Sequence, residues 1–153
     1  MGRLKKEVYI ELCHENALIP YYSDEEDAGA DVALCENIEI KPNETKLVNL
    51  GFKVAIPKGF ELQIRPRSGL SYKTSLRIPN SPATIDTNFR DELKVILHNI
   101  GEETLSFEKG DRIAQLVLNE VTKAKFIQIK NIKRIKGNRG GGIGSSKLNV
   151  KEQ

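Results

Sequence analysis

Hydrophobic and polar positions along the chain alternate mostly with the period of β-strands. Short runs rich in Val, Ile and Leu recur about every ten residues, and turn-forming residues separate them. The expected strands are Val8–Leu12, Ile38–Ile40, Lys46–Val54, Phe60–Arg65, Leu93–Asn99, Leu105–Phe107, Arg112–Leu118 and Lys125–Ile129. The turns between them are Pro42-Asn43, Pro57-Lys58-Gly59, Ile100-Gly101-Glu102 and Lys109-Gly110-Asp111. This pattern predicts an all-β sandwich or a jelly-roll-like barrel.

One short helix is expected among these strands. Residues Ser68–Lys73 can form it, and Ser68 is the candidate N-cap. From Asn131 onward the apolar pattern gives way to a basic, glycine-rich segment that can bury little surface. We therefore expect a β domain over residues 1–130 and a flexible C-terminal arm over residues 131–153.

The net charge of +3 hides an uneven distribution along the chain. Residues 121–151 contain nine Lys or Arg and no Asp or Glu, whereas the remainder has 15 basic and 21 acidic residues. Such asymmetry indicates that the basic segment contacts an anionic group. Because Trp is absent and aromatic residues make up only 6% of the chain, Val, Ile and Leu must form most of the core.

Several protein classes are excluded by simple patterns. No apolar run approaches the ~18 residues that a membrane-spanning helix requires, and the N-terminal sequence MGRLKKEVYI has no apolar h-region. Cys13 and Cys35 form no CxxC pair, and His14 and His98 lack a second metal ligand in register. We expect reduced thiols in a cytoplasmic protein, with no structural zinc and no membrane partner.

The segment Arg65–Leu70 follows an expected strand and opens the expected helix. Its proline fixes a turn, and Gly69 allows a ligand to approach the backbone closely. With the Arg67 guanidinium and the Ser68 hydroxyl alongside, the segment suits an oxyanion or a phosphate. The structural alternative is an ordinary Pro-Gly turn with exposed arginines.

The segment Pro79–Glu92 has apolar or β-branched flanks around Asp86, Thr87 and Asn88, which suggests a hairpin. Asp86 is a candidate general base, and Phe89 offers a ring face to a sugar or a base. The structural alternative is that Asp86 only closes an Asx-turn.

Three further segments carry weaker signals. In Ala28–Ala33 the carboxylate of Asp31 suits the orientation of metal-bound water, or the segment is a turn that leads into a strand. In Gly110–Leu118 the polar Gln115 needs partners for its amide, which are structural or a ligand phosphate. In Arg139–Ser146 glycines and hydroxyls surround an arginine and suit a polyphosphate, or form a plain linker.

Taken together and in order, these five segments resemble the motifs of the trimeric deoxyuridine triphosphatases (dUTPases). AGADVA is similar to the first motif, RPRSGL to the second, NSPATIDTNFRDE to the third, GDRIAQLVL to the fourth and RGGGIGSS to the fifth. The resemblance covers about residues 4–146. It implies a β jelly-roll homotrimer with three active sites at subunit contacts. It also implies that Mg²⁺ assists the conversion of dUTP and water to dUMP and pyrophosphate.

The resemblance also assigns roles to matching positions. Asp86 would orient and deprotonate the attacking water, and Phe89 would pack under the deoxyribose. The uracil edge would be read by Asn80 and by the backbone of Thr84, Ile85 and Lys94. The triphosphate would be held by Arg67, Ser68, Gly69 and Gln115, with Arg139 reaching it from a neighbouring subunit's arm. Asp31 would contact hydrated Mg²⁺ through water, and Ile143 would cover the uracil.

The chain departs from the family pattern at several of these positions. Phe89 stands where the family usually has Tyr, and Ala83 and Asp91 replace common glycines. Ile143 stands where a Phe normally stacks on uracil. Arg139 lies one residue closer to the glycine core of the fifth motif than is usual. This departure affects the role assigned to Arg139 and leaves the role assigned to Asp86 unchanged.

Two alternatives compete with this interpretation. The first is a deaminase of dCTP on the same fold, but the second motif here, PRSGL, has the triphosphatase form. The second is a non-enzymatic β module whose basic tail binds nucleic acid. That tail has Phe126 as its one aromatic residue and lacks an RNP1 motif, so we expect no nucleic-acid partner.

The resemblance to dUTPases also implies a cellular role. Such an enzyme would limit uracil incorporation into DNA and would supply dUMP for thymidylate synthesis.

Overall fold

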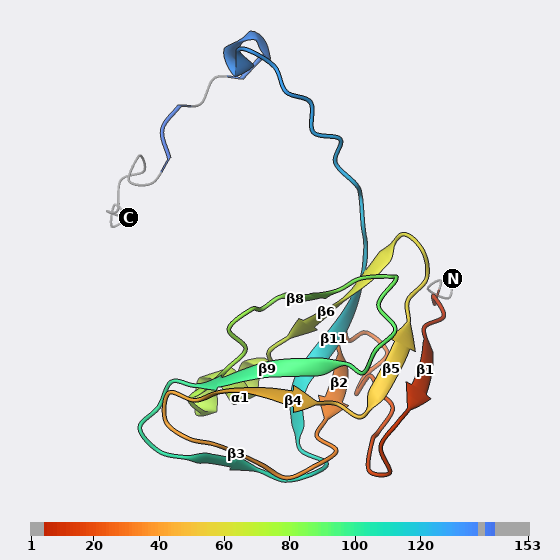
Figure 1. Ribbon diagram of the computed structural model, residues 1–153, viewed down its shortest axis with the longest axis vertical. Helices are drawn as coiled ribbons and strands as arrows, with labels where there is room; N and C mark the ends of the chain where they lie inside the picture. Colours follow the sequence, from red (N-terminus) through yellow and green to blue (C-terminus); the bar gives the residue numbers. More distant parts are fainter. Residues whose placement is uncertain (1–4, 138–139, 143–153) are drawn as a thin grey trace. The chain divides into compact units, whose positions relative to one another are not determined.

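The computed structural model describes residues 5–137 and 140–142, and these form eleven strands and two short helices (Figure 1). The strands are β1 Tyr9–Leu12, β2 Ala30–Ala33, β3 Ile38–Ile40, β4 Thr45–Asn49, β5 Phe52–Ala55, β6 Phe60–Arg65, β7 Leu76–Arg77, β8 Ala83–Ile85, β9 Lys94–Asn99, β10 Leu105–Phe107 and β11 Arg112–Glu120. The helices are α1 Ser68–Lys73 and the 3₁₀ turn η1 Ile132–Arg134. The predicted all-β architecture is confirmed.

Antiparallel ladders join the strands into sheets. The largest sheet has the strand order β2-β11-β6-β8, and a second has the order β4-β9-β7. Two smaller sheets pair β1 with β5 and β3 with β10. The long strand β11 pairs with β2 on one side and with β6 on the other, so the last strand of the domain lies between two strands from earlier in the chain.

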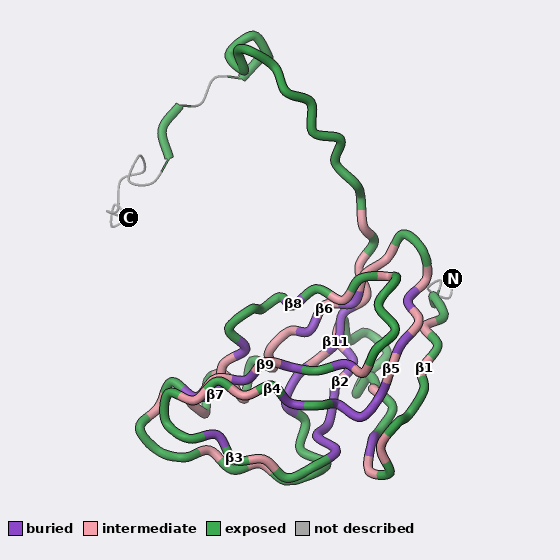
Figure 2. The backbone as a smooth tube through the Cα atoms, in the orientation of Figure 1, coloured by how far each residue is buried: buried purple, intermediate pink, exposed green. Residues whose placement is uncertain are grey.

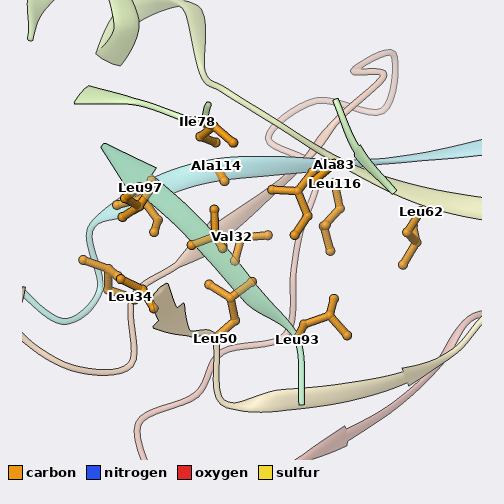
Figure 3. Close-up of a cluster of buried hydrophobic side chains, with 14 of the residues drawn as sticks. Val32, Leu34, Leu50, Leu62, Ile78, Ala83, Leu93, Leu97, Ala114 and Leu116 are labelled. Atoms are coloured by element: carbon orange, nitrogen blue, oxygen red, sulfur yellow. The ribbon is translucent and has the colours of Figure 1, made fainter. Parts of the chain in front are cut away.

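Mostly aliphatic side chains from all four sheets form the hydrophobic core. Figure 3 shows Val32 and Ala114 of the first sheet close to Leu97 of the second. The purple stretches of Figure 2 follow β2, β5 and β11, whose inward residues are almost fully buried. Phe52 is the largest of the described side chains that are fully buried, and the rest of the core is mostly Val, Ile and Leu.

Several expected elements have the bounds that the sequence predicted. The strands β3, β6 and β10 and the helix α1 match the prediction residue for residue. The expected strand Lys46–Val54 is in fact two strands, β4 and β5, that belong to different sheets. The chain breaks at Gly51, which has a φ of 79° and leaves room for no Cβ, since one would lie 2.8 Å from the Cβ of Ala17.

Two details of the predicted motifs are wrong. Arg67, not Ser68, occupies the N-cap position of α1, and no side chain caps the helix there. The expected hairpin around Asp86 does not form, because β8 pairs with β6 while β9 pairs with β4 and β7. The residues between β8 and β9 form a wide loop instead. The alternative for Ala28–Ala33, a turn that leads into a strand, is confirmed by β2.

The chain divides into two compact units, Met1–Thr122 and Lys123–Gln153. The boundary expected at residue 130 falls within the second unit. The strand expected at Lys125–Ile129 is wrong, because these residues have no regular secondary structure and Phe126 is 94% exposed. Alternating apolar residues cannot form a strand without a ladder partner for their backbone groups. In the described part of the chain, no helix is long and apolar enough to cross a membrane.

The side chain of Asn99, at the end of β9, is completely buried. Its Nδ2 donates to the carbonyls of Ile40 (3.0 Å) and Glu103 (2.7 Å). Its Oδ1 accepts from the Ser75 hydroxyl (2.7 Å) and from the Gly101 amide (2.9 Å). These four bonds use the full hydrogen-bonding capacity of the amide. They join β9 to β3, to the turn that follows β9 and to the residue that precedes β7.

We expect Asn99→Leu to lower the free energy of unfolding by about 3 kcal/mol, because it removes four hydrogen bonds that a completely buried amide makes. Thermal unfolding should show a melting temperature roughly 6–12 °C lower than that of the unchanged protein. The control is Asn37→Leu, at an exposed asparagine whose Oδ1 accepts one bond from the Lys109 amide. Equal losses in the two variants would contradict the role of the buried network.

Candidate active site

The turn between β6 and α1 borders a cavity of about 440 Å³. The lining residues include two cations, Arg67 and Lys73, and two hydroxyl side chains, Ser68 and Thr74. Gly69 contributes bare backbone, since a Cβ there would have no atom within 4 Å. Positive charge, hydroxyl groups and accessible backbone amides together suit a phosphate-bearing ligand.

Gln115 lies on β11, opposite Arg65 of β6 and opposite Asp31 of β2. Its Nε2 donates to the carbonyl of Pro66 at 2.8 Å, so the amide has a structural partner and also lines the cavity. A Cβ on Gly29 would lie 2.1 Å from the Gln115 Oε1. Only glycine at position 29 therefore leaves space for this amide.

The carboxylate of Asp31 is shared between two arginines. Its Oδ1 lies 2.9 Å from the Nε of Arg67, and its Oδ2 lies 2.8 Å from the Nη1 of Arg112. The Asp31 side chain is 12% exposed, whereas those of Arg67 and Arg112 are 30% and 40% exposed. The Tyr21 phenol and the Asp31 carboxylate raise the pKa of Arg112, so its guanidinium remains charged.

Asp86 is exposed and lies directly after β8. Its carbonyl accepts from the Phe89 amide at 3.1 Å, so the turn is closed by backbone and not by an Asx-turn. The Thr87 hydroxyl donates to the carbonyl of Ile56 at 2.8 Å. The Arg90 Nη1 donates to the carbonyls of Thr87 and Phe89, at 2.7 and 2.8 Å. Side chains therefore hold this loop in place of a strand ladder.

The loop is also attached at its far end. The Glu92 Oε1 accepts from the Gly51 amide at 3.1 Å, which fixes the segment just before β9 to the turn between β4 and β5. Phe89 is 38% exposed, so part of its ring is available to a ligand. Asn80, Thr84 and Lys94 are exposed as well, and Ile85 is half-buried.

The predicted site residues form two groups within one chain. The first group lines the cavity and consists of Arg67, Ser68, Gly69 and Gln115. Asp31 does not line the cavity but contacts Arg67. Asp86 follows Ile85, which pairs with Leu62, near the start of β6, whereas Gln115 pairs with Arg65 at its end (Figure 1). Asp86 is therefore displaced from Gln115 by about four residues along β6 and by the widths of two strand pairs, β8–β6 and β6–β11. At about 3.3 Å per residue and 4.8 Å per strand pair, this separation is roughly 16 Å. Arg139 and Ile143 lie outside the described residues.

Ser23 and Arg112 were not predicted as site residues. The Ser23 hydroxyl and the Arg112 guanidinium both approach the Asp31 Oδ2, at 3.4 and 2.8 Å. Arg112 had a usable signal, since it precedes Gln115 by three residues in the same motif. Among residues 5–137 and 140–142, no group of three His, Cys, Asp or Glu side chains could hold a metal ion.

Antiparallel sheets in this order, with a cationic cavity beside the single α-helix of the described chain, define an all-β protein of the jelly-roll type. A Tyr-to-Phe variant of the Staphylococcus bacteriophage 80alpha dUTPase, solved with dUpNHpp, superposes with a TM-score of 0.86. It is 25% identical, and the match covers 94% of this chain and 100% of that one. A variant dUTPase of phage phi11 of S. aureus, 24% identical and covering 84% and 99% of the two chains, shares the fold with a TM-score of 0.77.

Sequence comparison is more specific. The model of the dUTPase family matches residues 15–147. A deoxyuridine 5'-triphosphate nucleotidohydrolase of Wolinella succinogenes is 40% identical over 95% of this chain and 98% of its own. The corresponding protein of Zymomonas mobilis is 44% identical over 76% of this chain and 80% of its own. The chain belongs to the dUTPase family, which is a family of enzymes.

We expect Gly29→Ala to displace the Gln115 amide and break its bond to Pro66, at a cost of about 1 kcal/mol. The melting temperature should fall by roughly 2–4 °C. Gly137→Ala is the control, because a Cβ at that glycine would meet no atom within 4 Å. In a Gln115→Ala background, Gly29→Ala should cost much less, because of the clashing atoms only the Cβ of residue 115 remains, at 3.1 Å. A loss of undiminished size in this background would show that the clash is not with the Gln115 amide.

Proposed function

We propose that the protein hydrolyses dUTP to dUMP and pyrophosphate. The observation that carries the proposal is the cavity lined by Arg67, Ser68, Gly69 and Gln115, which suits a polyphosphate in a chain of the dUTPase family. Relatives that match over most of this chain are named deoxyuridine 5'-triphosphate nucleotidohydrolases. The phage 80alpha enzyme with the same fold was solved with dUpNHpp.

In this proposal the cavity binds the triphosphate. The Arg67 guanidinium has five N–H donors, and its bonds to Asp31 and to the Arg112 carbonyl occupy two of them. The remaining donors, the Ser68 hydroxyl, the Gly69 backbone and the second Nε2 proton of Gln115 are available to phosphate oxygens. Because these groups hardly need to reorganise, they stabilise the charge that develops during phosphoryl transfer.

Asp86 acts as the general base. An exposed carboxylate can accept a proton from a water molecule aligned for attack on phosphorus. Phe89 packs under the deoxyribose and leaves no space for a 2′-hydroxyl. Asn80 and the backbone of Thr84, Ile85 and Lys94 read the uracil edge, and a rigid backbone excludes the C5 methyl of thymine by overlap. A soft apolar pocket would discriminate one methyl group by only about 1–3 kcal/mol.

Mg²⁺ accompanies the triphosphate in this proposal. The ion prefers phosphate oxygens and retained waters to a cage of protein ligands. Asp31 fits an indirect role, because among the described residues its Oδ1 accepts only from Arg67 and has a second lone pair that can accept from metal-bound water. When bound, the ion neutralises charge on the phosphates. Arg67 and Gln115 hold and orient the same phosphates from the protein side.

A homotrimer with shared active sites explains why the two groups of residues lie apart. A base must come within hydrogen-bond distance of the water that attacks the substrate. Asp86 and Gln115 of one chain are separated by roughly 16 Å. We therefore propose that Asp86 of one subunit faces Arg67 of another. Residues 131–153 would act as a flexible arm that brings Arg139 and Ile143 to the site of a neighbouring subunit.

We place the reaction in the cytoplasm, where Cys13 and Cys35, both free in the structure, would stay reduced. Hydrolysis there would limit uracil incorporation into DNA and would supply dUMP for thymidylate synthesis.

The direct test measures pyrophosphate release from dUTP, dTTP, dCTP and UTP in the presence of Mg²⁺. We expect turnover of dUTP alone, since the methyl group, the amino group and the 2′-hydroxyl of the others are excluded. Ammonia release from dCTP would favour a deaminase. A salt-sensitive gel shift without turnover would favour a nucleic-acid-binding module.

Asp86→Asn should lower kcat for dUTP by about 10²–10⁴-fold, because the amide cannot accept the proton of the attacking water. Light scattering should show an unchanged oligomer. Asp91→Asn, the same change at an exposed residue of the same loop, is the matched control and should keep its activity. Full activity of Asp86→Asn would contradict the assignment of the base.

Mixing of subunits tests the shared site. Asp86→Asn and Arg67→Gln should each be nearly inactive as pure proteins. After the two variants are unfolded together and refolded, mixed trimers contain sites that combine an intact Asp86 with an intact Arg67. We expect activity to return only in the mixture. No recovery, with mixed trimers shown by mass spectrometry, would place both residues of a site in one subunit.

A further inference from the structure

A β-bulge in β11 brings Arg112 to the face of the sheet that carries the phosphate cavity. Arg112 pairs with Ala33 and Ala114 pairs with Val32, so the intervening Ile113 is an extra residue in the ladder. Ile113 and Ala114 are both buried, as expected when the alternation of faces is interrupted.

The bulge determines which side chains share that face. Asp31 and Ala33 are two residues apart on β2, so they lie on the same face of the sheet. Gln115 pairs with Asp31 and Arg112 pairs with Ala33, which places both β11 residues on this face. In a regular strand, residues 112 and 115 would point to opposite faces.

Arg67 is fixed at two points by this arrangement. Its Nε lies 2.9 Å from the Asp31 Oδ1, and its Nη1 donates to the Arg112 carbonyl at 3.2 Å. The Asp31 carboxylate is fixed in turn, because its Oδ2 accepts from the Arg112 Nη1 at 2.8 Å. The only other described donor to Asp31 Oδ2 is the Ser23 hydroxyl, at the longer distance of 3.4 Å.

We infer that Arg112 positions Arg67 for binding of the triphosphate, through the carboxylate of Asp31 that the two arginines share. The inference rests on the proposed function, which supplies the triphosphate. Arg112 does not line the cavity, so it acts on the substrate through Asp31 and Arg67. A carboxylate held by two guanidinium groups is ordered before the substrate arrives, and a preordered Arg67 loses less side-chain entropy on binding.

The arrangement also sets the local charge. Two guanidinium groups and one carboxylate leave one positive charge beside the cavity. Without Arg112 the Asp31–Arg67 pair would be neutral, and Asp31 would be free to turn both oxygens toward Arg67. A bidentate pair of this kind occupies two guanidinium donors that the phosphates need.

The test compares Arg112→Gln with the unchanged protein in calorimetric titrations with dUpNHpp and with dUMP. We expect the dissociation constant for dUpNHpp to rise about tenfold, the effect of losing one charge-assisted hydrogen bond. The constant for dUMP should stay within about twofold, because dUMP lacks the β and γ phosphates. Kinetically, KM for dUTP should rise more than kcat falls. A general loss of site structure would weaken both ligands equally and would overturn the inference.

Two further variants separate positioning from charge. Lys109→Gln removes one positive charge three residues away without touching Asp31, and it should bind dUpNHpp normally. Equal weakening in Lys109→Gln and Arg112→Gln would overturn the inference. Arg112→Lys keeps the charge and one contact, so it should fall between the unchanged protein and Arg112→Gln. If Arg112→Gln does not fold, Arg112→Lys replaces it in the test, and normal binding of dUpNHpp by Arg112→Lys would then overturn the inference.

Salt provides the last comparison. A long-range effect of charge is screened as ionic strength rises. Between about 0.05 M and 0.3 M KCl, the ratio of the dUpNHpp dissociation constants of Arg112→Gln and the unchanged protein should therefore lose only the part that comes from net charge and stay well above one, and a ratio that falls to one would overturn the inference. If the unchanged protein neither binds dUpNHpp nor releases pyrophosphate from dUTP, the proposed function itself has failed.

Discussion

The arrangement of the functional groups depends on β6, a strand that is paired along both edges. Its pairing with β11 brings Gln115 next to the turn that carries Arg67, and its pairing with β8 fixes the start of the loop that carries Asp86. Because β6 pairs with β11 at Arg65 and with β8 at Leu62, one end of the strand lies next to the cavity and the other end lies next to the loop that carries Asp86. The fold therefore keeps the two groups apart within each chain, and this is the separation that the proposed sharing of sites between subunits would bridge.

The elements that could be predicted from the sequence are those defined by local patterns. β3, β6 and β10 have alternating residues and clear turns, and α1 follows a proline turn. The two-residue strand β7 and the three-residue strand β8 depend on distant partners, so local periodicity could not reveal them. The same limit explains the wrong hairpin at Asp86 and the wrong strand at Lys125–Ile129. Motifs brought Arg67 and Gln115 together correctly, but the bulge that aligns Arg112 with Asp31 leaves no compositional trace.

The loop between β8 and β9 illustrates how an irregular segment acquires a defined shape. Thr87 contacts the carbonyl that follows β5, Arg90 binds two carbonyls of the loop itself, and Glu92 binds the Gly51 amide. Each contact uses a different neighbour, so the loop is held by side chains at several points and its other backbone groups stay accessible. Backbone that is both ordered and unpaired is well suited to reading the edge of a flat, polar ring.

The bulge at Ile113 lets residues that are three positions apart lie on one face of β11, as residues two positions apart do in a regular strand. Conservative replacements at Ile113 or Ala114 would alter only how the core packs. Deletion of Ile113 would remove the bulge, but Arg112 and Gln115 would then be two positions apart and would still share the face of Asp31. Related sequences can therefore lack one residue here and keep this arrangement, so a one-residue gap between these two positions in an alignment is no sign of a lost site.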